Sequence, residues 1–149
     1  MKKTAFFPGS FDPFTKGHED IVLRALTLFD EIVIGIGQNS NKNRYFNLEK
    51  MKGYIESTFA GKPVRVVTYQ NLTANVAHEY GAKFIIRGLR NTTDFEYENT
   101  ISQMNRYLNE ELDTVFLITS PPYAAISSTV IREVHRYGGD VTEFLPYSL

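Results

Sequence analysis

The sequence contains no cysteine. This excludes iron–sulfur clusters, zinc fingers, thiol nucleophiles and disulfide scaffolds, and it is consistent with a reducing compartment. An excess of one charge is also missing, because 16 Lys and Arg residues stand against 17 Asp and Glu residues, for a net charge of -1. A chain so balanced has no global field with which to hold a polyanion, so any bound phosphate must meet locally placed cations.

Long apolar segments are absent as well. No apolar run approaches the roughly 18 residues that a membrane-spanning helix needs, and Met1–Pro8 is too short for the apolar region of a signal peptide. We therefore expect a cytoplasmic protein. The 149 residues, 42% hydrophobic and 22% charged, predict a single globular domain over residues 1–149. A domain of this size is stable without disulfides or a structural metal.

What the sequence does contain is an alternation of short apolar runs with helical patterns. The runs predict strands at Thr4–Phe7, Ile32–Gly37, Val64–Tyr69, Phe84–Ile86 and Thr114–Thr119. Most of these runs are apolar at consecutive positions, which is typical of parallel strands buried on both faces. The third run alternates only in part, and this favours a strand near a sheet edge.

Apolar residues at three- and four-residue spacing predict a helix after each strand. They are Ile21, Val22, Ala25, Leu26 and Phe29; Leu48, Met51, Ile55 and Phe59; Leu72, Val76, Ala77 and Tyr80; Phe95, Ile101, Met104 and Leu108; and Val130, Ile131, Val134 and Tyr137. Gly81 and Gly138 stand where a left-handed C-cap would end the third and the last helix. The alternation predicts an α/β fold, namely a single doubly wound, five-stranded parallel sheet of Rossmann type with helices on both faces.

Ligands of such sheets bind beyond the carboxyl ends of the strands. The first of these loops, with the helix start behind it, is Pro8–His18, which holds two glycines and two prolines. A helix that begins near Gly17 directs free N–H groups at the loop and so favours an anion there. Ser10 and His18 offer a hydroxyl and a ring N–H to the same point. A turn followed by a capped helix would explain the glycines and prolines equally well.

Cations follow the second and the fourth strand. Lys42 lies in a polar loop, where a solvated lysine is the simpler interpretation. Arg87 and Arg90 come directly off the fourth strand, and their forked guanidinium groups are suited to phosphate. The two arginines can also pair with acidic residues just downstream, and the two roles do not exclude each other. Those acidic residues are Asp94, Glu96 and Glu98.

The loop after the fifth strand ends in three hydroxyl residues, Ser127, Ser128 and Thr129, which open the last helix. A plain N-cap would need only one of them. The three hydroxyls and the helix start together predict a second anion site. If the fourth and fifth strands lie on one side of the first, both anion sites face one crevice, and a polyphosphate can bridge them. Tyr123 could then lie against a base.

Other chemistries lack support in the sequence. There is no G-x-x-x-x-G-K-[ST] phosphate loop, and Gly35-Ile36-Gly37 is not followed by the third glycine of a dinucleotide motif, so we interpret it as strand-end packing. We expect surface or packing roles for His78 and His135. No His, Asp and Glu cluster has metal-ligand spacing, so we expect Mg²⁺ to arrive with a nucleotide.

Two motifs resemble those of a known superfamily. Gly9–Pro13 with Thr15–His18 is similar to the signature of the nucleotidyltransferases, a group that includes class I aminoacyl-tRNA synthetases, and Ile126–Arg132 is similar to their C-terminal partner motif. Ile86–Arg90 followed by Asp94–Glu98 is more specific and resembles the phosphopantetheine adenylyltransferase family, as does essentially the whole chain. The resemblance implies transfer of AMP from ATP, with Mg²⁺, to 4'-phosphopantetheine by direct in-line attack, giving dephospho-coenzyme A and pyrophosphate. It also implies a homo-oligomer, a hexamer in this family.

The resemblance further implies roles for single residues. His18, Lys42 and Arg90 would be catalytic. The residues that would bind phosphopantetheine are Ser10, Lys42, Thr73 and Arg87. Those that would bind ATP are Ser10, Phe11, His18, Gly88, Leu89, Arg90 and Glu98, together with Tyr123, Ala124, Ala125, Ile126, Ser127, Ser128 and Thr129.

Three residues depart from the family pattern. Tyr123 and Ala125 stand where tryptophan and phenylalanine are common, and Arg44 stands where proline is common. Two other functions stay open on the motifs alone. One is a related adenylyl- or cytidylyltransferase for another phosphate monoester, such as nicotinate mononucleotide. The other is a non-catalytic nucleotide-binding domain, which would not need His18.

Overall fold

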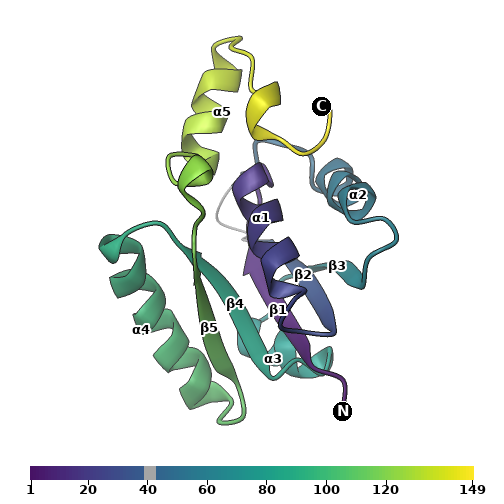
Figure 1. Cartoon of the computed structure of the whole chain (residues 1–149), viewed down its shortest axis with the longest axis vertical. Coiled ribbons are helices and arrows are strands. Elements are labelled where there is room, and N and C mark those ends of the chain that lie inside the picture. Colours follow the sequence, from purple (N-terminus) through teal and green to yellow (C-terminus); the bar gives the residue numbers. More distant parts are fainter. Residues whose placement is uncertain (39–42) are drawn as a thin grey trace.

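The computed structural model describes residues 1–38 and 43–149. In chain order the strands and α-helices are β1 (Thr4–Gly9), α1 (Lys16–Ala25), β2 (Glu31–Gly37), α2 (Leu48–Thr58), β3 (Val64–Tyr69), α3 (Thr73–Glu79), β4 (Phe84–Leu89), α4 (Thr92–Leu108), β5 (Asp113–Ile118) and α5 (Ser128–Arg136), and two short 3-10 helices lie at Pro121–Tyr123 and Thr142–Phe144. The strands form one parallel five-stranded sheet in the order β3-β2-β1-β4-β5 (Figure 1). The predicted fold class and the edge position of the third strand are confirmed.

Two apolar clusters cover the two faces of the sheet. On one face α1 and α2 bury Ile21, Val22 and Ile55 against inward residues of the strands. On the other face α3 packs Val76 and Ala77 against Phe6, Val33 and Ile85. This arrangement follows from right-handed crossovers, because the chain winds outward from β1 to β3 on one face and returns to β4 across the other.

Two strands run further than their apolar residues predict. β1 continues through Gly9, which pairs with Ile36 of β2, and β4 continues through Leu89, which pairs with Ile118 of β5. Backbone hydrogen bonds form the ladder, so a polar residue or a glycine can extend it where the neighbouring strand continues. Arg87 is therefore part of β4, and the expectation that the loop begins at this residue is wrong.

The apolar side predicted for the fourth helix is not buried within the chain. Phe95, Ile101, Met104 and Leu108 are 45%, 37%, 58% and 47% exposed, respectively. The buried residues of α4 are instead polar, Glu98 and Asn105. The helix therefore turns a polar stripe toward the sheet and leaves an apolar stripe on the surface.

Turns and glycines behave largely as the sequence predicts. Gly81 and Gly138 have φ values of 74° and 81° and follow the last turns of α3 and α5. Gly35 has no space for a side chain, because a Cβ there would lie 2.2 Å from Cζ of Phe6. This confirms its interpretation as a packing glycine. Within the described residues no helix is long and apolar enough to cross a membrane.

Candidate active site

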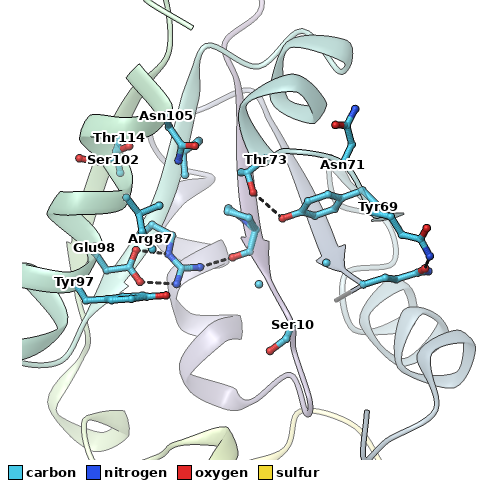
Figure 2. A pocket seen from close by; sticks show the side chains of 17 residues that line it. Ser10, Tyr69, Asn71, Thr73, Arg87, Tyr97, Glu98, Ser102, Asn105 and Thr114 are labelled. Atoms are coloured by element: carbon cyan, nitrogen blue, oxygen red, sulfur yellow. Dashed lines mark hydrogen bonds and ion pairs between the residues drawn. The ribbon is translucent and has the colours of Figure 1, made fainter. Parts of the chain in front are cut away.

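Two cavities adjoin at the carboxyl ends of β1 and β4. The first, of about 400 Å³, lies between these strands, the start of α3 and the polar side of α4 (Figure 2). The second, of about 300 Å³, lies between the first loop, the start of α1 and the segment before α5. Both cavities are lined by Gly9, Ser10, Arg87 and Glu98. Two ligands bound side by side would therefore meet at these four residues.

His18 stands in the wall of the second cavity, on the first turn of α1. Thr15 caps this helix, and its backbone N–H donates to Nδ1 of His18 at 3.0 Å. Because Nδ1 accepts a hydrogen bond from an amide, a neutral ring carries its proton on Nε2. Burial, followed by the charges of Arg87 and Arg90, lowers the pKa of His18 to about 3. The side chain is thus a neutral Nε2–H donor at pH 7.

Aromatic rings hold the imidazole of His18 in place. The ring centroid of Phe11 lies 5.0 Å away at an interplanar angle of 82°, and that of Phe14 lies 5.2 Å away. Phe11 and Phe14 are both buried, with exposed fractions of 3% and 0%. A side chain packed among buried rings loses little further freedom when it meets a ligand, so its donor is preorganised.

The two arginines of β4 and its following turn are paired inside the protein. Arg87 donates from Nε and Nη2 to the carboxylate of Glu98 at 2.8 and 2.6 Å, and from Nη1 to the carbonyl of Pro8 (Figure 2). Arg90 donates to Asp94 at 3.1 Å. The pairing with downstream carboxylates is therefore confirmed. A guanidinium has five N–H donors, so Arg87 keeps further donors for a ligand.

The three hydroxyl groups at the start of α5 each make a hydrogen bond within the chain. Ser127 caps the helix by accepting from the N–H of Val130 at 3.1 Å. Ser128 donates to the carbonyl of Pro13 at 2.8 Å, which joins this segment to the first loop. Thr129 accepts from Arg132 at 3.3 Å. All three residues line the second cavity. Because β4 and β5 lie on one side of β1, the N-termini of α1 and α5 both open onto this cavity.

Several polar side chains line the first cavity. Tyr69 and Thr73 share a hydrogen bond of 3.1 Å between their hydroxyls (Figure 2). Burial raises the pKa of Tyr69, so its hydroxyl keeps the proton. Across the cavity α4 presents Ser102 and Asn105.

The predicted site residues can now be placed. The second cavity is lined by Ser10, Phe11, His18, Arg87, Gly88, Arg90, Glu98, Tyr123, Ile126, Ser127, Ser128 and Thr129. Thr73 lines the first cavity, together with Ser10, Arg87 and Glu98. Leu89 and Ala124 line neither cavity, and Ala125 lines a separate apolar hollow beside α5. Lys42 lies outside the described residues.

Sequence reasoning missed most of the first cavity. Its wall includes Gln38, Tyr69, Gln70, Asn71, Tyr97, Ile101, Ser102, Asn105 and Thr114. A signal was present in α4, where Glu98, Ser102 and Asn105 follow each other at helical spacing and form a polar stripe. Within residues 1–38 and 43–149, no group of three or more His, Cys, Asp or Glu side chains could hold a metal ion.

Known proteins resemble this chain along its whole length. The family model described as cytidylyltransferase-like matches residues 6–134. A phosphopantetheine adenylyltransferase of Cytophaga hutchinsonii is 60% identical, over 100% of both chains. A protein of the same name from Flavobacterium johnsoniae is 50% identical, over 98% of this chain and 95% of the relative.

Solved structures share the fold at much lower identity. A bifunctional NMN adenylyltransferase/ADP ribose pyrophosphatase of Francisella tularensis, complexed with AMP and a manganese ion, superposes with a TM-score of 0.73 at 20% identity. The match covers 100% of this chain and 46% of that one, so the chain spans about half of that protein. A nicotinate-nucleotide adenylyltransferase, described as putative, from Vibrio parahaemolyticus has a TM-score of 0.67 at 20% identity, over 97% and 94% of the two chains.

Proposed function

The chain belongs to the phosphopantetheine adenylyltransferase family, and on this premise we propose that it transfers AMP from ATP to 4'-phosphopantetheine, giving dephospho-coenzyme A and pyrophosphate. The observation that carries this proposal is the 60% identity over the full length of both chains. The two adjoining cavities support it, because a transfer between two substrates needs two sites with a common border.

In this proposal each cavity takes one substrate. ATP occupies the cavity of His18, where two helix N-termini and Arg90 favour its phosphates. 4'-Phosphopantetheine occupies the cavity of Thr73, whose hydroxyls and amides suit the amide groups of the pantetheine arm. Its phosphate then lies at the border formed by Ser10 and Arg87, next to the α-phosphate of ATP.

The chemistry is a direct displacement at phosphorus. An oxygen of the phosphate of 4'-phosphopantetheine bonds to the α-phosphorus of ATP, and the bond from that phosphorus to the bridging oxygen breaks, releasing pyrophosphate. His18 donates from Nε2 to an oxygen of the reacting phosphate, where negative charge develops. Arg90 and Lys42 add positive charge at the same centre. No covalent enzyme intermediate takes part, because positioning and electrostatics suffice for phosphoryl-type transfer.

Mg²⁺ enters this proposal as part of the substrate, bound by the phosphates of ATP. We also propose that the enzyme is cytoplasmic and that it forms a homo-oligomer, namely the hexamer that the family resemblance implies. The apolar stripe on the surface of α4 supports an oligomer, because a contiguous exposed apolar surface marks an interaction site.

The main alternative is transfer to another phosphate monoester, such as nicotinate mononucleotide. The solved structures named for such substrates are about 20% identical to this chain, which is a likeness of fold only. The relatives named phosphopantetheine adenylyltransferase are 45% to 60% identical. A non-catalytic nucleotide-binding domain is disfavoured by the preorganised donor at His18.

An acceptor panel tests the proposed function. The full chain is mixed with Mg-ATP and, in separate reactions, 4'-phosphopantetheine, nicotinate mononucleotide, nicotinamide mononucleotide or glycerol 3-phosphate, and pyrophosphate release is measured. We expect turnover with 4'-phosphopantetheine alone, and none with ATP in the absence of an acceptor. Turnover with another acceptor and none with 4'-phosphopantetheine would overturn the assignment.

A further inference from the structure

Arg44 lies outside both cavities, yet its guanidinium binds the backbone of a loop that lines them. Nη1 donates to the carbonyl of Ser10 at 2.5 Å, and Nη2 donates to the carbonyl of Phe11 at 2.9 Å. Nε donates to the carbonyl of Phe46 at 3.1 Å. One side chain thus joins the first loop to the segment before α2.

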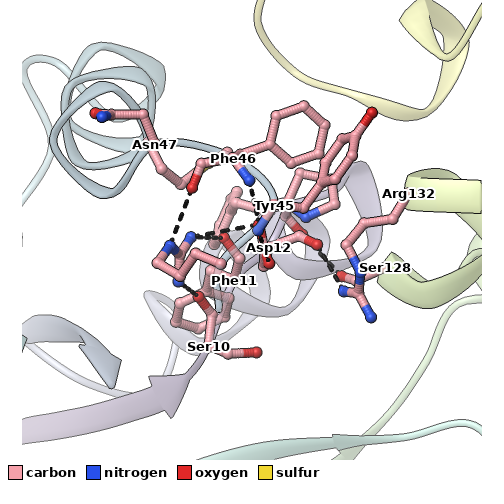
Figure 3. Close-up of polar contacts among 12 residues, drawn as sticks. Ser10, Phe11, Asp12, Tyr45, Phe46, Asn47, Ser128 and Arg132 are labelled. Carbon is pink, nitrogen blue, oxygen red and sulfur yellow. Dashed lines mark hydrogen bonds and ion pairs between the residues drawn. The ribbon is translucent and has the colours of Figure 1, made fainter. Parts of the chain in front are cut away.

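Asp12 completes this connection from the opposite direction. Its two carboxylate oxygens accept from the backbone N–H groups of Tyr45 and Phe46 at 2.9 and 2.8 Å (Figure 3). The same carboxylate lies 3.8 Å from Nη2 of Arg44, with side chains that are 10% and 19% exposed. Four hydrogen bonds between charged groups and backbone, together with this ion pair, therefore connect residues 10–12 with residues 44–46, in a partly desolvated place where such bonds are strong.

The bonds of Arg44 determine which way two peptide groups of the first loop face. In a planar trans peptide the C=O and the following N–H point in opposite directions. The carbonyls of Ser10 and Phe11 face Arg44, so the N–H groups of Phe11 and Asp12 face away from it. Neither N–H has a hydrogen-bond partner among the described residues. Ser10 and Phe11 line the cavity of His18, and Arg44 does not.

The backbone at Phe11 needs such a restraint. Its φ is 44°, in the left-handed region that non-glycine residues rarely adopt. This conformation is maintained only where surrounding contacts determine it. The ring of Phe11 is fixed by packing, and its carbonyl is fixed by Arg44.

We propose that Arg44 is a positioning residue for nucleotide binding: its guanidinium orients the Ser10–Phe11 and Phe11–Asp12 peptides so that their N–H groups face a phosphate in the cavity of His18. This inference rests on the proposed function for the identity of the nucleotide. The preorganised N–H groups add to the helix N-terminus and to His18 as uncharged donors around one anion.

Three variants of the full chain test this inference. Arg44→Met keeps the aliphatic stem and removes all donors, and Arg44→Lys keeps the charge but not the fork. Arg65→Met is the matched control, because Arg65 is exposed on β3 and lines neither cavity. Calorimetry measures the dissociation constants of ATP and of 4'-phosphopantetheine separately, and thermal unfolding of each variant is recorded.

We expect Arg44→Met to weaken ATP binding about 10-fold, the usual effect of losing a hydrogen bond to an ionic group. Arg44→Lys is expected to fall between Arg44→Met and the wild type, while Arg65→Met binds as the wild type does. Binding of 4'-phosphopantetheine should change less than about 3-fold, because Phe11 lines only the cavity of His18.

Unchanged ATP binding in Arg44→Met would overturn the inference. So would an equal loss for both ligands, since this would indicate a general structural role. If Arg44→Met fails to fold, Arg44→Lys is the deciding variant. A selective loss of ATP binding in Arg44→Lys supports the inference, and no loss overturns it. These measurements do not need turnover. A wild-type chain that binds ATP but transfers no AMP to 4'-phosphopantetheine would refute the proposed function and leave the Arg44 test intact.

Discussion

At the scale of single residues, the sequence predicts which functional groups come together, but not the hydrogen bonds that these groups make within the chain. Ser10, His18 and Arg90 come together at the second cavity, as expected from helix starts and strand ends. The bond from the amide of Thr15 to Nδ1 of His18 was not predicted, because histidine is not among the usual reciprocal partners in a capping box. Arg44 bonds to residues that are 34 and 33 positions away in the sequence, so no local sequence pattern predicts these contacts.

His18 carries the first prediction at this scale. In His18→Ala the donor at Nε2 is lost and nothing replaces it, so we expect kcat to fall by roughly 10²–10³, the cost of removing one preorganised donor. Steady-state release of pyrophosphate from Mg-ATP and 4'-phosphopantetheine measures this. His78→Ala is the matched control, because His78 is exposed on α3, away from both cavities. A His18→Ala enzyme with normal kcat and normal thermal unfolding would reduce His18 to a helix-start residue.

At the scale of elements, periodicity predicts well where a strand or a helix occurs, but it predicts less well which side of a helix faces the sheet. The five strands and five main helices stand close to their predicted places, because consecutive apolar runs and helical spacing are strong signals. The orientation of α4 was not predicted correctly. Its apolar residues point outward and its buried positions are Glu98 and Asn105, since the inward side of this helix forms a cavity wall rather than a core.

Two glycine positions distinguish a packed strand from an open helix surface. A Cβ on Gly35 would lie 2.2 Å from the ring of Phe6 and 2.9 Å from that of Tyr69, both from neighbouring strands. Gly35→Ala therefore overpacks the sheet, and we expect a loss of about 3 kcal/mol in the free energy of unfolding. Gly53 is exposed within α2 and a Cβ there meets nothing within 4 Å. Gly53→Ala should stabilise the chain by about 0.5–1 kcal/mol through its better helix propensity.

Denaturant unfolding of both variants beside the wild type, at one protein concentration, checks the pair. The opposite signs of the two shifts are the result that matters, because the chemical change is the same in both. An unchanged free energy of unfolding in Gly35→Ala would mean that the ring of Phe6 on β1 does not pack so closely against Gly35 on β2.

At the scale of the whole molecule, a chain with a net charge of -1 meets two phosphorylated substrates with hydrogen-bond donors that are placed locally. Arg87 and Arg90 both line the cavity of His18, where each is paired with a carboxylate but keeps further N–H donors, and two helix N-termini open onto the same cavity. Overall composition argues against a polyanion binder, and only the topology shows that strands β1 and β4 bring these groups together. The proposed homo-oligomer is predicted from the sequence only by the family resemblance, since neither charge nor composition indicates one.

The apolar stripe of α4 makes the oligomer testable. Ile101, Met104 and Leu108 of this stripe follow Tyr97 at helical spacing, and all four side chains are exposed in the single chain. A charge placed within a buried interface is costly, because it loses its hydration without gaining a partner. We expect Met104→Glu to dissociate the oligomer into smaller species, as measured by light scattering after size exclusion. Leu28→Glu is the control, since Leu28 is exposed to a similar degree, 53% against 58%, but lies after α1.

The same substitution should also affect activity through binding of one substrate. Tyr97 and Ile101 line the first cavity as well as the exposed stripe, so a subunit packed on this stripe closes one side of that cavity. Dissociation by Met104→Glu should then raise KM for 4'-phosphopantetheine and leave KM for ATP nearly unchanged. A wild-type chain that runs as a 17.0 kDa monomer, or a Met104→Glu variant of unchanged size, would show that α4 faces solvent in the working enzyme.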